Sequence, residues 1–543
     1  MAANGEELTE ADQLLADQVA EWSTNTNEAF TVHFIQGDRE VEVFNPEFTY
    51  PIYGDEEVIF GYQDLSISLA FAAHNLRPHL SVNYARKWTP RGEIRASDVR
   101  EPLRDFLPPA VFSKDTSRES ALADPGAAKF VPPGEKLESF DTENGTYEVW
   151  CASLTDARAK EILQNVQILV PMFIEGGTVL ELEYPWIVER WKVFFLYKVT
   201  PEPSPNVSPY VFAGYATAFQ VFALSERGDV LEAELKPNSE TDIDRFIKDW
   251  SDPEATGKTP LSLPSRERIS QFILLPAHQG SGLGSRLYSA VYSKLTAPSN
   301  ITELTVEDPN EAFDDMRDIC DLNHLRASSS TFAELTISTS IPASSLSAAV
   351  VIPTSIIVPD KTRRLLAQES KIQTRQLSRL IEMQLLSTIP RLHRSASRIT
   401  RRDRATNAYD RAYYFWRLLV KERLYQHNRD TLIQLEPQDR IEKVEQAAES
   451  VRSDYERLID TAERRAKIFF SGRGKGRKRA SDDVDDDMDD EDGQQRQQLT
   501  PLRKKRLRVV DDDDEEAEED QAGEADGAED EDEEGEDVDV DDS

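Results

Sequence analysis

The chain has 543 residues, of which 39% are hydrophobic and 30% charged, and its formal net charge is −38. Residues 481–543 hold 31 acidic and 6 basic residues and so account for −25 of that charge. This length predicts more than one domain, and the charge argues against general phosphate-backbone binding and favours a basic protein partner.

Residues 8–135 are predicted to form a mixed α/β N-terminal domain. Segments rich in Val, Ile and aromatic residues favour strands at 31–36, 41–54 and 79–88, and residues 64–75 fit a helix or a strand. Residues 113–140 combine Pro, Gly, Ser and Ala without apolar periodicity, so we expect a linker or an insertion there.

Residues 136–320 are predicted to form a second α/β domain. A helix over 159–176 should end near Pro171. Strands are expected at 191–200, 210–224, 266–276 and 301–309. The last two strands enclose a glycine-rich loop and a helix, which predicts a βαβ unit.

The remainder of the chain changes character twice. Residues 321–360 are rich in Ser, Thr and Pro, so we expect an inserted loop. Residues 361–470 have apolar residues at three- and four-residue spacings, which predicts a helical C-terminal domain. Residues 471–543 have no core-forming pattern and are expected to be a disordered tail.

The glycine-rich stretch LLPAHQGSGLGSRLYSAVYSKL, residues 274–295, resembles a phosphate-binding loop. Its spacing matches neither the Walker A pattern nor the G-x-G-x-x-G dinucleotide fingerprint. It does match Gln279-x-x-Gly282-x-Gly284, the spacing of an acetyl-CoA pyrophosphate loop, in which bare amides and a helix N-terminus face the phosphates. A glycine-rich turn without a ligand remains the alternative at this point.

The segments on either side of the loop support the first interpretation. Leu283, Leu287, Val291 and Leu295 repeat every four residues and predict one buried helix stripe. Pro276 fits the end of a strand. Strands that separate there would expose backbone amides to an extended pantetheine arm.

Two acids follow the next strand. Glu307 and Asp308 come at its carboxyl end, the edge at which α/β sheets bind ligands. Acyl transfer to a lysine needs a base, because the ammonium has a pKa near 10.4, and a carboxylate can supply that base. The alternative is a helix N-cap followed by a solvated acidic face. We favour the base for Glu307 and the solvated face for Asp314 and Asp315.

Several segments together resemble a known family. ERISQFILLPAHQGSGLGSRLY followed by ITELTVEDPNEAFDDMRD is similar to the fungal type B histone acetyltransferase catalytic subunits, within the GNAT superfamily. YGDEEVIFGYQDL, ERWKVFFLY and RLIEMQLL are similar as well. The resemblance implies an α/β fold with a GNAT acetyltransferase core, a mixed α/β N-terminal domain, a helical C-terminal domain and a disordered acidic tail.

The resemblance also implies roles for individual residues. Glu307 would be the general base, with Asp308 and Glu189 as further acids near the amine. Glu56, Glu57 and Phe219 would bind the histone tail. The acetyl-CoA site would be formed by Phe272, Ile273, Leu274, Gln279, Gly280, Ser281, Gly282, Leu283, Gly284, Ser285, Asn310 and Phe313. The lysine would attack the thioester directly, without an acyl-enzyme.

The implied activity is acetyl transfer from acetyl-CoA to lysines in the tail of newly synthesised, non-nucleosomal histone H-four. Histone H-three and a β-propeller histone chaperone subunit would be partners. Two alternatives stay open here. One is a GNAT enzyme that acts on other protein amines, and the other is a non-enzymatic acidic histone chaperone.

Other features predict absences or minor roles. Seven scattered histidines without ligand spacing predict no metal, and His278 is expected to be an exposed turn residue. Cys151 and Cys320 favour a reducing compartment and structural roles. No stretch predicts a membrane span or a signal peptide, and we expect a protein of the cytoplasm and nucleus that does not bind nucleic acid directly.

The basic stretches of the C-terminal part have more than one interpretation. Residues 391–405 fit a solvated face better than an acidic-partner site. SGRGKGRKR, residues 471–479, resembles the start of histone H-four, so one hypothesis is that Lys475 or Lys478 is a built-in pseudosubstrate or an autoacetylation site. A nuclear-import signal is the favoured alternative, and residues 501–508 form a second such cluster.

Overall fold

The computed structural model describes residues 20–90, 92, 94–112, 117–201, 205–223, 259–337, 354–399 and 407–472. It divides into two units, Met1–Trp416 with Ser453–Gly474 and Arg417–Arg452 with Lys475–Ser543. Helices and strands alternate through the first half and helices dominate the last part, which confirms the α/β prediction. The tail expected beyond residue 472, with Lys475 and Lys478, lies outside the described residues, as do 338–353 and 400–406.

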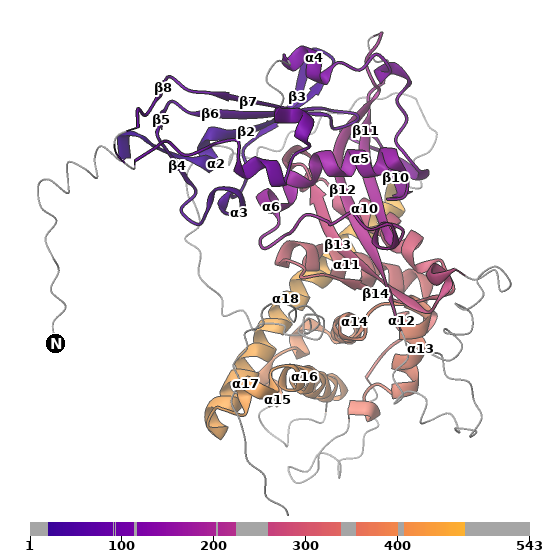
Figure 1. Ribbon diagram of the computed structural model, residues 1–543. Coiled ribbons are helices and arrows are strands. Elements are labelled where there is room, and N and C mark those ends of the chain that lie inside the picture. Colours follow the sequence, from indigo (N-terminus) through magenta and orange to yellow (C-terminus); the bar gives the residue numbers. More distant parts are fainter. Residues whose placement is uncertain are drawn as a thin grey trace, which may run out of the picture. The chain divides into compact units, whose positions relative to one another are not determined.

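The N-terminal part is built on a four-stranded sheet with the order β3-β2-β6-β7 (Figure 1). Its strands are β2 (Phe30–Gln36), β3 (Arg39–Phe44), β6 (Ser66–Ala72) and β7 (Pro78–Asn83). Two small pairs flank it, β1 (Ser23–Asn25) with β4 (Val58–Phe60) and β5 (Tyr62–Gln63) with β8 (Arg86–Lys87). Residues 64–75 are therefore mainly a strand, and the strand predicted at 41–54 ends at Phe44 and is followed by helix α3 (Tyr50–Tyr53).

The central sheet has six strands in the order β14-β13-β12-β11-β10-β9. Their bounds are β9 (Glu135–Thr142), β10 (Gly145–Ser153), β11 (Trp191–Val199), β12 (Tyr210–Phe222), β13 (Ser265–Leu274) and β14 (Ile301–Val306). All neighbours are antiparallel except β13 and β14, which are parallel and enclose helix α10 (Leu283–Thr296). This confirms the predicted βαβ unit, and the four apolar residues of its helix stripe are buried.

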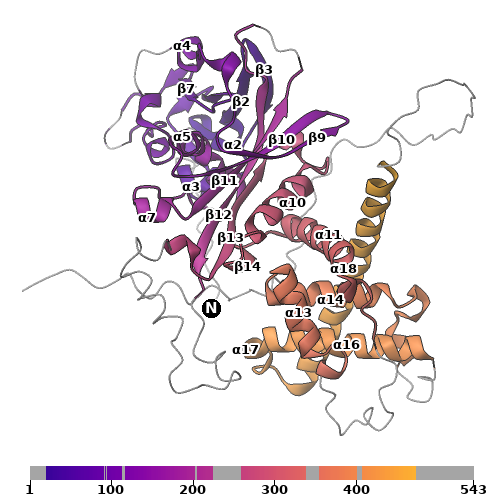
Figure 2. The ribbon, with the colours of Figure 1, turned by 90° about the vertical axis from the view of Figure 1, so that its right-hand side faces the viewer.

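Both faces of the central sheet are covered (Figure 2). Helix α10 packs on one face, against β9, β11, β13 and β14. On the other face, α5 (Ala157–Val166) and α6 (Val170–Phe173) share one hydrophobic core with the N-terminal sheet. The rings of Phe34 and Phe212 stack across it with centroids 6.0 Å apart. The N-terminal and central sheets are thus joined by packing.

Three sequence-based expectations differ from the structure. Pro171 lies in the first turn of α6, directly after Val170, instead of ending a helix, since its missing N–H is tolerated there. The expected linker at 113–140 contains α4 (Arg118–Leu122) and the start of β9, an edge strand whose exposed side chains hide the strand pattern. The expected loop at 321–360 begins inside helix α11 (Glu311–Ser328), because buried Leu322 and Leu325 continue its apolar face.

Helices form the rest of the first unit. They are α7 (Pro185–Val188), α12 (Ser330–Ala333), α13 (Asp360–Ser370), α14 (Thr374–Ser387), α15 (Ala396–Ile399), the start of α16 (Ala408–His427) and the end of α18 (Pro437–Gly472). Residues after α13 cover the outer edge of β14, where Leu304 N–H donates to the Lys371 carbonyl at 2.6 Å. No described helix is long and apolar enough to cross a membrane.

The second unit contains the end of α16, α17 (Arg429–Leu432) and the beginning of α18. Arg440 closes the turn between the last two helices by donating to the carbonyls of Leu432 and Leu435, at 2.9 and 3.0 Å. Glu445 accepts hydrogen bonds from both Arg417 and Lys421.

Candidate active site

Strands β13 and β14 separate at the carboxyl end of β14. Their pairing ends at Ile269 and Val306, with a last bond from Glu307 N–H to the Ile269 carbonyl at 2.9 Å. Strand β13 continues to Leu274, which still pairs with Gly214 of β12. Within the described residues no strand pairs with the other edge of Ser270–Leu274, so this notch leaves backbone groups for an extended ligand.

The glycine loop closes one end of the notch. Gly280 and Gly282 have φ angles of 71° and 82°, a region that favours glycine, and a Cβ at either position would meet open space. Gly282 caps α10 without a side-chain hydrogen bond, so the first amides of the helix have no capping group. A bare, uncapped helix N-terminus beside open space fits an anionic group such as the acetyl-CoA pyrophosphate.

Gly284 has a different role from the other two loop glycines. A Cβ at Gly284 would lie 2.9 Å from the sulfur of Met316 and 3.3 Å from a methyl group of Leu274. Glycine at this position therefore allows α10 to approach α11 and the end of β13.

Polar contacts hold the loop to the strand before it. The Gln279 amide donates to the Leu274 carbonyl and the Ser281 hydroxyl to the His278 carbonyl, both at 2.9 Å. Ala277 N–H donates to Glu42 of β3 at 3.0 Å. The N-terminal sheet thus helps to position the start of the glycine loop.

His278 is buried, which corrects the expected exposed turn residue. Its Nδ1 lies 3.2 Å from the Tyr147 hydroxyl and its Nε2 lies 3.6 Å from a Glu42 oxygen. Burial lowers the pKa of His278 to about 4 and raises the pKa of Glu42. The imidazole is therefore neutral at physiological pH and acts as a packed link between the loop and two strands.

The predicted acetyl-CoA residues gather around the notch. The rings of Phe272 and Phe313 meet edge to face with centroids 5.1 Å apart. The Asn310 side chain caps α11 by accepting from Phe313 N–H at 2.9 Å. Ile273 points to the opposite face and is buried in the core, so it can reach a ligand in the notch only through its backbone.

Glu307 lies at the mouth of the notch. Its Oε2 accepts a hydrogen bond from the Ser270 hydroxyl at 2.5 Å and lies 3.6 Å from Arg268 Nε. The alternation along β13 places Arg268, Ser270 and Phe272 on one face of the strand. Sequence reasoning missed Arg268 and Ser270, although period-two counting back from Phe272 would have found both.

The other two predicted acids lie differently. Asp308 is exposed and has a φ angle of 32°, an uncommon conformation for a residue other than glycine, at the turn from β14 into α11. Glu189 is exposed at the end of α7. Register aligns Trp191, Phe219, Arg268 and Thr305 in one row. Three strand spacings, about 14 Å, therefore separate β11, which begins just after Glu189, from β14, which ends just before Glu307. Among the described residues, no hydrogen bond or ion pair joins these two acids.

Phe219 belongs to this row and packs against two neighbouring side chains. Its ring centroid lies 4.6 Å from that of Trp191, and the Arg190 guanidinium lies 4.3 Å above it. It is two strands away from β14 and directly across from Arg268.

Glu56 and Glu57, predicted to bind the substrate, have different environments. Glu57 accepts hydrogen bonds from Thr49 N–H at 2.6 Å, Tyr50 N–H at 3.1 Å and the Asn27 amide at 2.7 Å. Its carboxylate therefore holds the loop between α3 and β4 in place. Glu56 is exposed, so of the two it has the geometry to meet a basic peptide.

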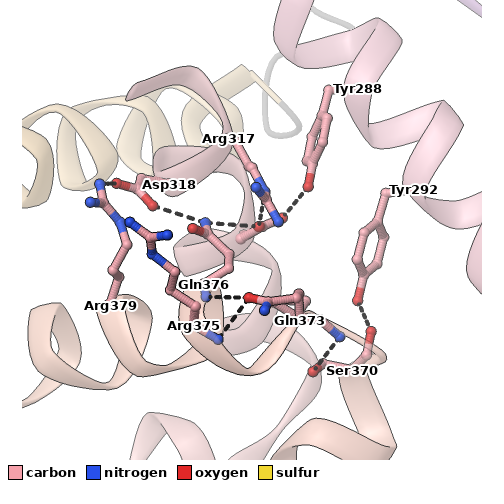
Figure 3. Close-up of polar contacts among 11 residues, drawn as sticks. Tyr288, Tyr292, Arg317, Asp318, Ser370, Gln373, Arg375, Gln376 and Arg379 are labelled. Atoms are coloured by element: carbon pink, nitrogen blue, oxygen red, sulfur yellow. Dashed lines mark hydrogen bonds and ion pairs between the residues drawn. The ribbon is translucent and has the colours of Figure 1, made fainter. Parts of the chain in front are cut away.

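A buried polar network holds helix α11, which begins just after Glu307 (Figure 3). Tyr288 of α10 donates to Asp321 at 2.8 Å, and Gln376 of α14 donates to Asp318 at 2.8 Å and to Asp321 at 3.3 Å. Arg379 donates to Asp318 at 2.5 Å. Burial raises the pKa of Asp321 to about 6. The network joins the loop helix, the helix after the acids and the helical domain.

Asp314 and Asp315 were expected to lie on a solvated face, but the structure shows that they do not. Asp315 forms a two-point ion pair with Arg457 of α18, at 2.5 and 2.9 Å. Burial raises the pKa of Asp314. Both acids are half-buried, and the end of α18 contacts α11 at Asp315.

Cys151 is buried and Cys320 is partly buried. Burial raises the pKa of both Cys151 and Cys320 to about 11, so neither thiol is prepared as a nucleophile. Within the described part of the chain, no cluster of three or more His, Cys, Asp or Glu side chains could hold a metal ion.

Comparison with known proteins agrees with this geometry. Residues 22–175 match the family model described as "Histone acetyl transferase HAT1 N-terminus". The histone acetyltransferase type B catalytic subunit of Aspergillus oryzae is 39% identical over 81% of this chain and 86% of its own length. Those of Pyricularia oryzae and Candida albicans are 37% and 30% identical, over 82% and 81% of this chain and 92% and 91% of their own lengths.

These similarities extend over most of the chain, through the notch, the glycine loop and the helices behind them. They favour a histone acetyltransferase, with acetyl-CoA as its co-substrate, over the two alternatives left open by the sequence. The chain belongs to the family of histone acetyltransferase type B catalytic subunits.

Proposed function

We propose that this enzyme acetylates lysine side chains in the N-terminal tail of newly synthesised, non-nucleosomal histone H-four, with Glu307 as the general base. The observation that carries the proposal is the position of Glu307, at the point where β13 and β14 separate. A carboxylate there meets an amine that approaches a thioester held along the open edge of β13.

The residues around the notch would bind different parts of acetyl-CoA. The backbone of Phe272, Ile273 and Leu274 would pair with the pantetheine arm, and the loop from Gln279 to Ser285 would hold the pyrophosphate with its amides. Acetyl-CoA supplies the activated acetyl group. Packing of Phe272 against Phe313 supports the cofactor-facing side of β13.

Glu307 would take the proton from the lysine ammonium, because only the neutral amine is a nucleophile. Ser270 and Arg268 would orient its carboxylate through the contacts at 2.5 and 3.6 Å. Asp308 and Glu189 would add negative potential that attracts a basic tail.

The substrate would approach across the N-terminal part of the molecule. The proposed contacts for the tail are two. One is Glu56, which is exposed beside the loop that Glu57 holds in place, and the other is the aromatic ring of Phe219. The acidic composition suits a basic partner. Histone H-three, a β-propeller histone chaperone subunit, and a distribution between cytoplasm and nucleus are parts of the same proposal.

The test uses the full-length protein, acetyl-CoA and separate tail peptides of free histones H-four and H-three. Acetyl-lysine is measured by mass spectrometry for the wild type, for Glu307→Gln, and for Glu334→Gln as an exposed control distant from the notch. We expect preference for the H-four peptide. For Glu307→Gln we expect a rate lower by ~10²–10⁴, the usual contribution of a general base, with acetyl-CoA affinity retained.

Two results would contradict different parts of the proposal. A Glu307→Gln variant as fast as the wild type would remove Glu307 as the base. Equal or faster acetylation of the H-three peptide would remove the H-four preference and leave the chemistry intact.

A further inference from the structure

The end of helix α18 runs along α11 toward the glycine loop (Figure 2). Two contacts fix this position, the ion pair of Arg457 with Asp315 and a hydrogen bond from the Asn323 amide to the Ala462 carbonyl at 3.2 Å. Ala462 is fully buried at this contact. The next turn of α18 lies at the start of α10, although Arg465 follows Ser285 by 180 residues.

Arg465, in that turn, reaches the loop directly. Its Nη1 donates to the Ser285 hydroxyl at 2.9 Å. Ser285 is the third residue of α10 and the last residue of the predicted pyrophosphate loop. An arginine from the helical domain thus lies beside the uncapped amides of the loop.

The charged surroundings of Arg465 differ from those of the arginines near it. Within the described residues, no carboxylate lies within ion-pair distance of Arg465, whereas neighbouring Arg286 and Arg457 are paired with Glu138 and Asp315. A helix N-terminus is itself electropositive, so a cation beside it is unfavourable unless an anion is bound there. The Arg465 guanidinium and the electropositive helix N-terminus meet at Ser285, and the open, uncapped loop there suits an anionic ligand.

We propose that Arg465 is part of the acetyl-CoA site and binds the cofactor's phosphates together with the loop amides, so that the C-terminal helix completes the site. This rests on the proposed role of the loop. A guanidinium suits the task because its several N–H groups can contact a phosphate and the Ser285 hydroxyl together. The acetyl group and Glu307 lie at the other end of the cofactor, so Arg465 affects binding and not the chemical step.

The control residue is the neighbouring Arg464. It donates along its own helix, to the Asp460 carbonyl at 3.4 Å and the Thr461 hydroxyl at 3.1 Å. Arg464→Gln removes the same charge from the same turn of α18. It leaves the contact with Ser285 in place.

The test measures the Kd of coenzyme A and of pantetheine, which lacks the phosphates, by calorimetry on the full chain. For Arg465→Gln we expect coenzyme A to bind about 10–100-fold more weakly, the usual range for a lost charge-assisted hydrogen bond. Pantetheine affinity and kcat at saturating acetyl-CoA should not change. Arg465→Lys should recover part of the loss, and Arg464→Gln should bind like the wild type.

Each other outcome has a defined meaning. If the wild type binds coenzyme A and Arg465→Gln binds it equally well, Arg465 is not a phosphate ligand. An equal loss for pantetheine and coenzyme A, or a loss of kcat alone, would assign Arg465 a structural role and overturn the proposal. If the wild type itself does not bind coenzyme A, the proposed role of the loop fails, and this inference fails with it.

Discussion

Two pairs of acidic residues, one before helix α11 and one within it, have opposite environments. Glu307 and Asp308 precede the helix at the edge of the notch, whereas Asp318 and Asp321 lie in its middle, in the network with Tyr288, Gln376 and Arg379. The Glu307 side chain is 36% exposed and the Asp318 side chain 1%. The acid proposed to exchange protons stays near water, and the acids that fix the helix are buried and paired.

This difference has a physical reason. A buried carboxylate is tolerated only with partners that offset its desolvation, and such partners also fix its position. A base must instead meet a substrate that arrives and leaves, so it keeps an accessible side. The buried acids Asp318 and Asp321 hold helix α11 in place. The N-cap of that helix, Asn310, closely follows the exposed acids Glu307 and Asp308, so the buried pair helps to position the exposed pair.

The largest effect on stability is expected when Asp318 is replaced. Asp318→Asn removes the carboxylate that faces Arg379 and should lower the free energy of unfolding by about 3–5 kcal/mol, because a partly buried guanidinium loses its counter-charge. Urea unfolding followed by tryptophan fluorescence measures this change.

Asp315→Asn is the matched control for that experiment. It breaks an ion pair on the same helix whose two side chains are 30% and 50% exposed, and should cost about 0–1 kcal/mol. Equal losses for the two variants would show that burial does not distinguish the two pairs.

The pH dependence of stability tests the environment of the buried acids in a second way, with a somewhat smaller expected effect. Burial raises the pKa of Asp321 to about 6, above the ordinary value of about 3.9. The folded state then holds its proton more tightly than the unfolded state. Stability from this group is therefore fully present below about pH 4 and is lost as the pH rises to about 6.

A shift of about two pKa units corresponds to about 3 kcal/mol between these pH limits. The free energy of unfolding of the wild type relative to Asp321→Asn should therefore fall as the pH rises, measured by urea unfolding at several pH values. A difference that stays constant, or grows with pH, would contradict a raised pKa.

The smallest expected effect concerns the exposed group. Ser270→Ala removes the hydroxyl that donates to Glu307, a contact of about 0.5–1.5 kcal/mol. We expect kcat to fall about 2–10-fold with the KM for acetyl-CoA unchanged, since the base loses orientation and the cofactor contacts stay. Steady-state kinetics measures both constants.

Ser378→Ala provides the reference for that variant. Its hydroxyl donates to the Thr374 carbonyl of its own helix, away from the notch, and it should behave as the wild type. A Ser270→Ala enzyme with full kcat would indicate that Glu307 needs no such support.

Local sequence patterns were enough to predict the segment that carries the candidate site. Glycine spacing, the four-residue repeat of Leu283, Leu287, Val291 and Leu295, and the acids after a short strand were enough to predict strand, loop, helix and strand in the right order. Asn310 caps the helix that follows these acids. These features depend on neighbours a few residues apart, which a single sequence displays directly.

Which polar groups are buried and paired depends on how the whole chain packs. This packing buries His278 against Tyr147, engages Glu57 in a loop contact, joins Asp318 to Arg379, and brings Arg465 to Ser285. The last two pairs are 61 and 180 residues apart in sequence. Such contacts follow from how the sheet and helices pack together, and no local periodicity encodes them, because burial and partner choice are properties of the assembled fold.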